Sequence, residues 1–188
     1  SDLTTVGNAT TGNVTASNIT TITGSAAEVI SAYADIETGL GDEAITITGS
    51  TTVAQAKELN GLTSGIVTAT IDSNSTISAI LNSSTGITES GGSNAYSITI
   101  HSNDATATAA NLNALNELTT VDVDATAVTA INGTLSDLVT LYTAAGVSNL
   151  GNEIVTINNT GSVAASDLTT VGDATTGNVT ASNITTIT

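Results

Sequence analysis

Acidic side chains are the residues of this chain whose types and spacing come closest to a metal-binding pattern. Asp122 and Asp124 alternate along a predicted strand and so share one face, where calcium could take both among its several oxygen ligands. Only one part of the chain has this pair, which favours a solvated strand face. Asp42-Glu43 and Glu153 precede predicted strands in matching positions. They could bind calcium at an edge or simply keep that edge soluble, and we favour the second interpretation.

Catalytic chemistry finds little support in the sequence. His101 is the single histidine, the chain has no cysteine, and we expect His101 to be exposed at a strand end. The serines form no G-x-S-x-G motif, and neither a D-x-D-x-D-G loop nor a G-G-x-G-x-D nonapeptide occurs. Repeats rarely preserve a unique cleft, and aromatic platforms for sugars are missing. We therefore expect no enzyme, no catalytic residue and no cofactor, with calcium the one ion left open.

The charge balance limits the possible partners. The sequence has seventeen acidic residues and one basic residue, Lys57, which gives a formal net charge of −16. Nucleic-acid binding needs Lys and Arg to neutralise phosphates, so it is excluded, and docking on anionic membranes is disfavoured. The sequence has no apolar run near 20 residues and predicts no direct membrane insertion. Asn-x-Ser/Thr sequons are frequent and follow from composition alone, for example at Asn13, Asn18, Asn74, Asn132 and Asn158.

Two kinds of short segment alternate and would position these side chains. Alternating apolar and β-branched residues predict strands at residues 44–47, 66–71, 98–100 and 121–125. Apolar residues three or four apart predict helices at residues 25–36, 53–62 and 106–118. Ser25 and Glu28 form an S-x-x-E capping box, and we expect Asp104 or Thr106 to cap the third helix.

The chain contains a nearly perfect internal copy. Residues 166–188 repeat residues 1–23 at every position but one, where Asp173 replaces Asn8. A looser repeat of about 55 residues lies inside this long period. Its matching segments begin at Leu3, Leu59, Leu112 and Leu168. The units are 1–47 (unit 1, a partial start), 48–100 (unit 2), 101–157 (unit 3) and 158–188 (the start of the next unit, containing the copy).

The repeat predicts an α/β repeat solenoid, with parallel short strands and short helices. Each unit contains helix, strand, helix and strand, which gives about two coils per unit of about 55 residues, each coil near 27 residues. A core of small aliphatic residues suits such stacking, because the chain has no Phe, Trp, Met, Pro or Cys. The alternative is an all-β solenoid in which the predicted helices are turns. A β-sandwich array is disfavoured because the units are too short for seven strands.

Three stretches carry a family resemblance: TTGNVTASNITTITGSAAEV at 10–29, GLGDEAITI at 39–47 and LNALNELTTVDVDATAVTAINGTLSDLV at 112–139. They resemble repeats of Thr/Ala/Asn-rich giant cell-surface, adhesin-like proteins of cyanobacteria and other aquatic bacteria. Those units follow the pattern L-x-x-L-x-x-x-T-x-x-V-x-A-x-x-I-x-x-I-x-G, from which the middle unit departs by lacking the Ile-x-x-Ile-x-Gly ending. The resemblance implies an extracellular location at the cell surface, a structural or adhesive role, and no catalytic residues.

We therefore expect a structural segment of a long extracellular tandem-repeat protein that forms a filament, rod or surface coat. The absence of a start Met and of a leader fits an excerpt of such a protein. Neither end of the sequence has a polar cap, so the expected partners are copies of itself, joined end to end or by covalent continuation of the array.

Two other functions are compatible with parts of the sequence. An adhesin module that binds glycans or a surface would use unusual exposed residues, and the candidates are Lys57 and the stretch Gly91-Gly92-Ser93-Asn94. Ice binding would use threonine ladders such as Thr46/Thr48 and Thr68/Thr70. It needs Thr-x-Thr on every coil, which this sequence does not supply regularly.

Overall fold

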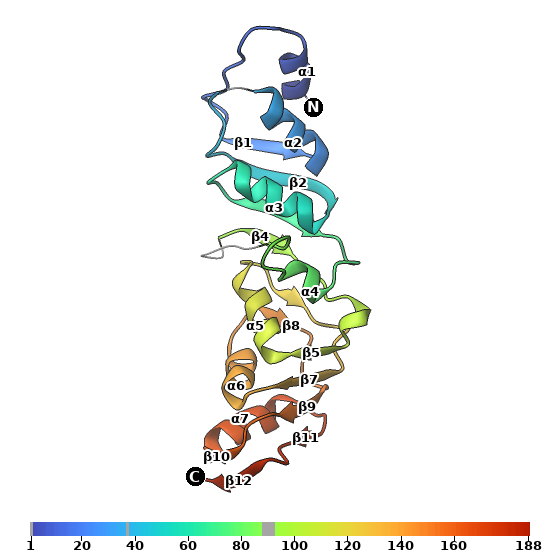
Figure 1. The fold of residues 1–188 in the computed structure, drawn as a ribbon, viewed down its shortest axis with the longest axis vertical. Coiled ribbons are helices and arrows are strands. Elements are labelled where there is room, and N and C mark those ends of the chain that lie inside the picture. The colour runs from blue at the N-terminus through green and yellow to red at the C-terminus, as the bar shows by residue number, and fades with distance from the viewer. Residues whose placement is uncertain (1, 37, 88–92) are drawn as a thin grey trace.

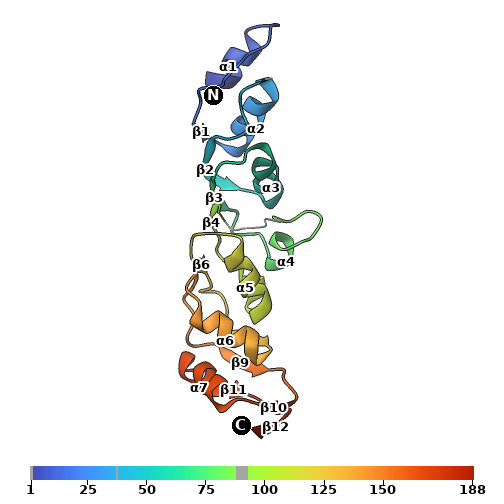
Figure 2. The ribbon, with the colours of Figure 1, turned by 90° about the vertical axis from the view of Figure 1, so that its left-hand side faces the viewer.

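The molecule is elongated, and its elements run broadly in chain order along the long axis, with β8 (Val147–Ser148) beside α5 (Ala109–Glu117) (Figure 1). The computed structural model describes residues 2–36, 38–87 and 93–188. Helix α1 (Asp2–Asn8) lies at one end and strand β12 (Ile184–Ile187) at the other (Figure 1). In the N-terminal half, α2 (Ala26–Asp35) and α3 (Val53–Leu62) lie to one side of the strands (Figure 2).

Short helices and short strands alternate over the described residues. The other helices are α4 (Ile77–Ile80), α5 (Ala109–Glu117), α6 (Leu135–Thr143), α7 (Ala165–Ala174) and the 3-10 turn η1 (Ser102–Asp104). The other strands are β1 (Thr21–Gly24), β2 (Ala44–Thr51), β3 (Val67–Ile71), β4 (Ala95–Ser97), β5 (Thr106–Thr108), β6 (Val123–Asp124), β7 (Ala130–Gly133), β8 (Val147–Ser148), β9 (Ile154–Ile157), β10 (Gly161–Val163) and β11 (Val179–Thr180). In this part of the chain no helix has both the length and the hydrophobicity that crossing a bilayer requires.

All the strand pairings in the described residues are parallel. Two four-stranded sheets have the orders β1-β2-β3-β4 and β11-β9-β7-β5, and β6 pairs with β8 and β10 with β12. Ile45 pairs with Val67, and Ala130 pairs with Ile154. Parallel strands need a crossover connection, and each crossover here contains one of the helices.

The core consists of small aliphatic side chains that alternate with polar ones along the strands. In β3 the side chains of Val67, Ala69 and Ile71 are buried, whereas the threonines between them are exposed. This is the alternation of a sheet with one solvated face. One continuous apolar cluster extends from Ile22 in β1 to Val171 in α7.

The predicted fold class is confirmed at the level of an α/β fold with parallel strands and short helices. The all-β alternative is wrong, because the predicted helical segments at 25–36 and 53–62 are the helices α2 and α3. The capping box before α2 is also confirmed. The Ser25 hydroxyl accepts from the Glu28 amide, and the Ser25 amide donates to the Glu28 carboxylate at 2.9 Å.

The predicted helix at 106–118 begins later than expected. Thr106–Thr108 is strand β5, and Thr108 is the N-cap of α5, accepting from the Asn111 amide at 3.1 Å. Asp104 instead accepts from the Ile77 amide at 2.8 Å, so it caps α4, which precedes it in the chain. Two predicted strands are also shorter. Residues 98–100 contribute only the bridge between Thr99 and Asp124, and 121–125 reduces to β6.

Candidate functional site: buried glutamates and their tyrosine partners

The two glutamates that precede strands in matching positions are buried. Glu43 is 1% exposed and Glu153 is 0% exposed. The favoured interpretation, that they keep an edge soluble, is therefore wrong for these two residues. Only the neighbouring Asp42 is exposed. A buried carboxylate is costly unless it is hydrogen-bonded, so the partners of these groups define the candidate site.

The more completely buried carboxylate, Glu153, accepts three hydrogen bonds. The Tyr142 hydroxyl donates to Oε1 at 2.6 Å, and the amides of Gly151 and Asn152 donate to Oε2 at 2.8 and 3.0 Å. Gly151 has a φ of 127°, which lies outside the conformations that side chains favour. Helix α6 supplies the tyrosine, and the loop before β9 supplies the glutamate and the amides. We call this set the Tyr142–Glu153 joint.

The N-terminal half contains the same joint. The Tyr33 hydroxyl, from α2, donates to Glu43 Oε2 at 2.5 Å, and the Gly41 amide donates to both carboxylate oxygens at 2.8 and 2.9 Å. Gly41 also has a positive φ, 137°. Tyrosine and glutamate are ten residues apart here and eleven in the Tyr142–Glu153 joint. The two joints therefore occupy the same place in units that the sequence repeat relates.

Burial is the main reason why the pKa of both tyrosines is raised. It raises the pKa of Tyr33 and of Tyr142 above the ordinary value, and the hydrogen bond to a carboxylate and its negative charge raise them further. Both effects favour the neutral phenol, which is the form that can donate.

The next loop along the chain closes over each glutamate. The Thr175 hydroxyl donates to the backbone carbonyl of Glu153 at 2.8 Å and accepts from the Gly177 amide at 3.0 Å. A Cβ on Gly177 would lie 2.2 Å from that carbonyl oxygen, so only glycine fits. Thr63 and Gly65 hold the same relation to the other buried glutamate. The joint thus ties a helix, its following strand and the next loop together.

Unit 2 has Tyr96 at the position of the glutamates, where the Thr119 hydroxyl donates to the Tyr96 carbonyl at 2.7 Å and accepts from the Val121 amide at 3.1 Å. Asn94 lies two residues earlier, at the position of Gly41 and Gly151.

Asn94 is buried, accepts from the Val67 amide at 2.6 Å and donates to Asn60 at 2.8 Å. The Asn94 side chain is therefore buried and hydrogen-bonded inside the protein, so it is not one of the exposed residues that glycan binding would need. Gly91-Gly92 lies outside the described residues. Lys57 donates to the Ser84 carbonyl.

Asp124, the other calcium candidate, is a turn-capping residue. Its Oδ1 accepts from the Thr126 hydroxyl at 2.6 Å, from the Thr126 amide at 3.0 Å and from Asn149 at 2.9 Å. The Thr126 bonds, followed by that of Asn149, hold the pKa of Asp124 below its ordinary value. Asp122 is exposed. In the described residues, no three His, Asp or Glu side chains gather as a metal site.

The remaining candidates have local roles. The His101 side chain is half-buried, not exposed as expected, and its Nδ1 accepts from the Asn103 amide at 3.0 Å, which caps η1. The sequon asparagines are exposed at Asn13, Asn18, Asn74 and Asn158 and half-buried at Asn132.

The threonine ladder is present but short. Thr23, Thr46 and Thr68 pair in register on three adjacent strands, and the next partner is Ala95. Thr70 lies between Ser50 and Ser97. Thr48 falls within a register shift.

From the sequence, Glu43 and Glu153 were placed in matching positions, but neither of them was connected with a tyrosine. The signal was the near-constant spacing between tyrosine and glutamate in two units. Chemically, both carboxylates are buried and accept hydrogen bonds from a tyrosine and from loop amides, so the arrangement holds loops in place. No family model, curated protein sequence or solved structure matches this chain.

Proposed function

We propose that this chain is a structural segment of a long extracellular tandem-repeat protein, built as an α/β solenoid that forms a filament, rod or surface coat. The observation that carries the proposal is the serial stacking of elements along one axis, with the two ends of the chain at opposite ends of the molecule (Figure 1). A solenoid gains its core by stacking neighbours, and its length follows the number of coils.

Three further features support a structural role. One apolar cluster runs through the molecule from Ile22 to Val171, so no break separates one part from the next. The Tyr33–Glu43 and Tyr142–Glu153 joints tie each helix to the loop after it, and the hydroxyls of Thr63 and Thr175 in the next loop donate to the backbone carbonyls of the two glutamates. The net charge of −16 keeps neighbouring molecules apart and soluble, which suits a long surface protein.

Electron microscopy tests this proposal on native material. Antibodies raised against the chain, with gold labelling of the source cells, should mark the outer surface, and the labelled material should be fibrous or layered. Label confined to the cell interior, or globular labelled particles, would contradict the proposal. Solution scattering from the purified chain should give the profile of a rod, and that of a sphere would exclude the solenoid.

A further inference from the structure

One of the nine Asn-x-Ser/Thr sequons in the sequence differs from the others. It lies in the stretch Asp72-Ser73-Asn74-Ser75-Thr76, where an acidic residue stands two positions before the asparagine. At the other eight sequons that position holds valine, threonine, alanine or isoleucine. Their asparagines are Asn8, Asn13, Asn18, Asn82, Asn132, Asn158, Asn178 and Asn183. Composition accounts for sequons in such a chain, but only this one is combined with a charge.

Asn74 lies in an exposed turn that connects β3 to α4 (Figure 2). The Ser75 amide donates to the Asp72 carbonyl at 2.8 Å and closes the turn, and the central residues Ser73 and Asn74 are exposed. The Asp72 amide donates to the Thr51 carbonyl at 2.9 Å, which attaches the turn to the end of β2. The Asn74 side chain therefore stands in solvent on a loop of defined shape.

The same turn brings a carboxylate next to the amide of Asn74. Asp72 Oδ1 accepts from the backbone amide of Asn74 at 3.0 Å and from its side-chain Nδ2 at 2.9 Å. These bonds hold the pKa of Asp72 below its ordinary value, so the carboxylate is charged at neutral pH. An accessible carboxylate is a group that the arginine of an enzyme can bind by charge-assisted hydrogen bonds.

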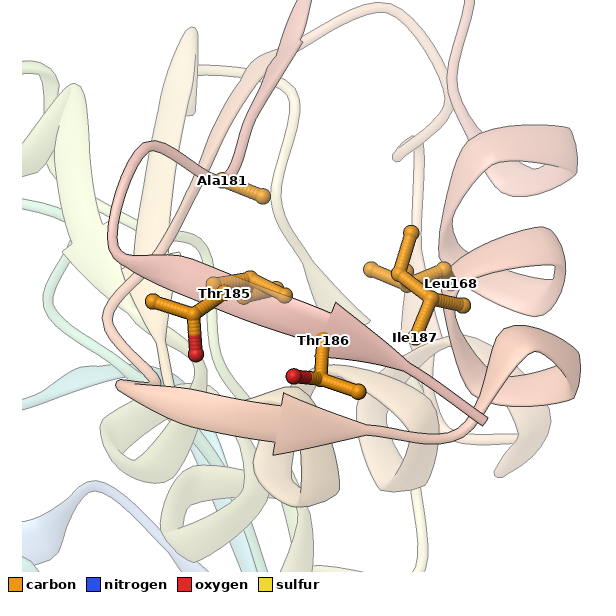
Figure 3. Close-up of a pocket in the computed structure, with 6 residues that line it drawn as sticks. Leu168, Ala181, Thr185, Thr186 and Ile187 are labelled. Atoms are coloured by element: carbon orange, nitrogen blue, oxygen red, sulfur yellow. The ribbon is translucent and has the colours of Figure 1, made fainter.

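The other sequons lack the charge, and several also lie in less accessible places. Asn132 is half-buried in β7, and Asn8 lies in α1. The sequon of Asn183 runs into β12, where Thr185 lines a hollow between that strand and α7 (Figure 3). Asn158 is exposed like Asn74 but has no acidic residue before it. Exposure and charge therefore coincide at Asn74.

We infer that Asn74 is an acceptor site for an N-linked glycan, which an oligosaccharyltransferase transfers from a lipid-pyrophosphate-linked oligosaccharide. Asn74 Nδ2 forms a bond to the anomeric carbon of the first sugar, and the bond from that carbon to the pyrophosphate oxygen breaks. The lipid pyrophosphate leaves, and the amide loses one proton to a base of the transferase. Asp72 and Thr76 are the groups that the transferase recognises on either side of the asparagine. The inference rests on the proposed extracellular role, because sequons are modified on secreted chains.

Glycosylation in a bacterial host tests the site. The full chain is expressed with a secretion leader in cells that carry an oligosaccharyltransferase and its lipid-linked oligosaccharide. A protease that cleaves after glutamate then releases residues 59–89, which contain the sequons of both Asn74 and Asn82. We expect mass spectrometry to find this peptide heavier by one glycan, with fragmentation placing the glycan on Asn74. An unmodified peptide, or a glycan on Asn82 alone, would overturn the inference.

Two variants separate the charge of Asp72 from the shape of the turn. Asp72→Asn keeps a side-chain oxygen that can accept from Asn74, and we expect it to slow glycosylation at least about tenfold, because a charge-assisted bond to the transferase is lost. Glu117→Gln is the matched control, since it removes one exposed charge from α5 and should leave glycosylation unchanged. Equal glycosylation of Asp72→Asn and the unaltered chain would overturn the selection of Asn74 by Asp72.

This test and the proposed function fail separately, because the host supplies the export. A chain that takes no glycan in the host but labels the surface of its source cells would overturn the acceptor site and leave the structural role standing. A chain that is glycosylated at Asn74 in the host but lies inside its source cells would overturn the proposed function alone.

Discussion

At the scale of single residues, the buried Glu153 carboxylate depends on its tyrosine. Tyr142→Phe removes the donor to Oε1 while keeping the ring, so an acceptor is left buried without that partner. We expect the free energy of unfolding to fall by roughly 1–3 kcal/mol, the cost of an unsatisfied buried polar group. Chemical denaturation measures the change.

A double-mutant cycle provides the control. Glu153→Gln and the double variant complete the cycle with Tyr142→Phe. Because the two side chains share a hydrogen bond, we expect a coupling free energy of roughly 0.5–3 kcal/mol. Losses that simply add would show that the two groups act independently.

The raised tyrosine pKa values make stability depend on alkaline pH. The unfolded chain has an ordinary tyrosine pKa of about 10. The folded pKa is higher for Tyr33 and Tyr142, so above about pH 10 the unfolded chain binds fewer protons than the folded one and stability falls as pH rises. Thermal unfolding from about pH 9 to 11 should show this decline, and it should be weaker in Tyr33→Phe/Tyr142→Phe. An unchanged decline in the variant would assign the effect to other groups.

The close approach of Gly177 to the Glu153 carbonyl gives a paired test. Gly177→Ala forces the loop away from a backbone atom, and we expect a loss of roughly 1–3 kcal/mol. Gly172→Ala is the control, because it lies in α7 with open space around its Cβ and should be neutral or stabilising by up to about 1 kcal/mol. Equal effects in denaturation would mean that the loop can move freely.

At the scale of elements, helix ends are capped by residues more than twenty positions later in the chain. Asn159 accepts from the Leu135 amide at the start of α6 at 2.6 Å, just as Asp104 accepts from the Ile77 amide of α4. Asn159→Ala should cost about 0.5–2 kcal/mol, as the loss of a helix cap does. It should also speed hydrogen exchange of the Leu135 amide specifically.

The neighbouring asparagine is the matched control for this cap. Asn158 is exposed, so Asn158→Ala should leave both stability and the exchange of Leu135 unchanged. Similar exchange rates at Leu135 in the two variants would contradict the capping role of Asn159.

Local elements were predictable where their signals are local. Helix α3 was predicted with its observed ends, because the apolar spacing that indicates it lies within its ten residues. Asp104 was placed on the wrong helix, because its bond to Ile77 spans 27 positions and depends on stacking. The burial of Glu43 and Glu153 was missed for a different reason, since their tyrosine partners are only ten and eleven positions away. A carboxylate alone predicts exposure, and only its tyrosine from the previous helix reverses that expectation.

At the scale of the whole molecule, the internal copy predicts more of the architecture than any single motif does. It predicted serially repeated segments, and the α/β class with parallel strands is what the described residues show. It could not show that Ile22 is buried in the first copy whereas its counterpart Ile187 is exposed in the second, because burial depends on neighbours and both copies have almost the same sequence.

The net charge gives the last prediction. The chain has seventeen acidic side chains and one basic one, and the acidic side chains repel one another along the elongated molecule. Salt screens such repulsion, because the Debye length is about 8 Å at physiological ionic strength. The unfolding temperature should therefore rise with NaCl concentration. CaCl₂ and MgCl₂ at equal ionic strength should raise it alike, because the described residues contain no cluster of three acidic side chains that could select calcium. Asp122→Asn should leave this equality intact. A rise with calcium well beyond that with magnesium, lost in Asp122→Asn, would instead identify a specific site on that strand and overturn the screening explanation.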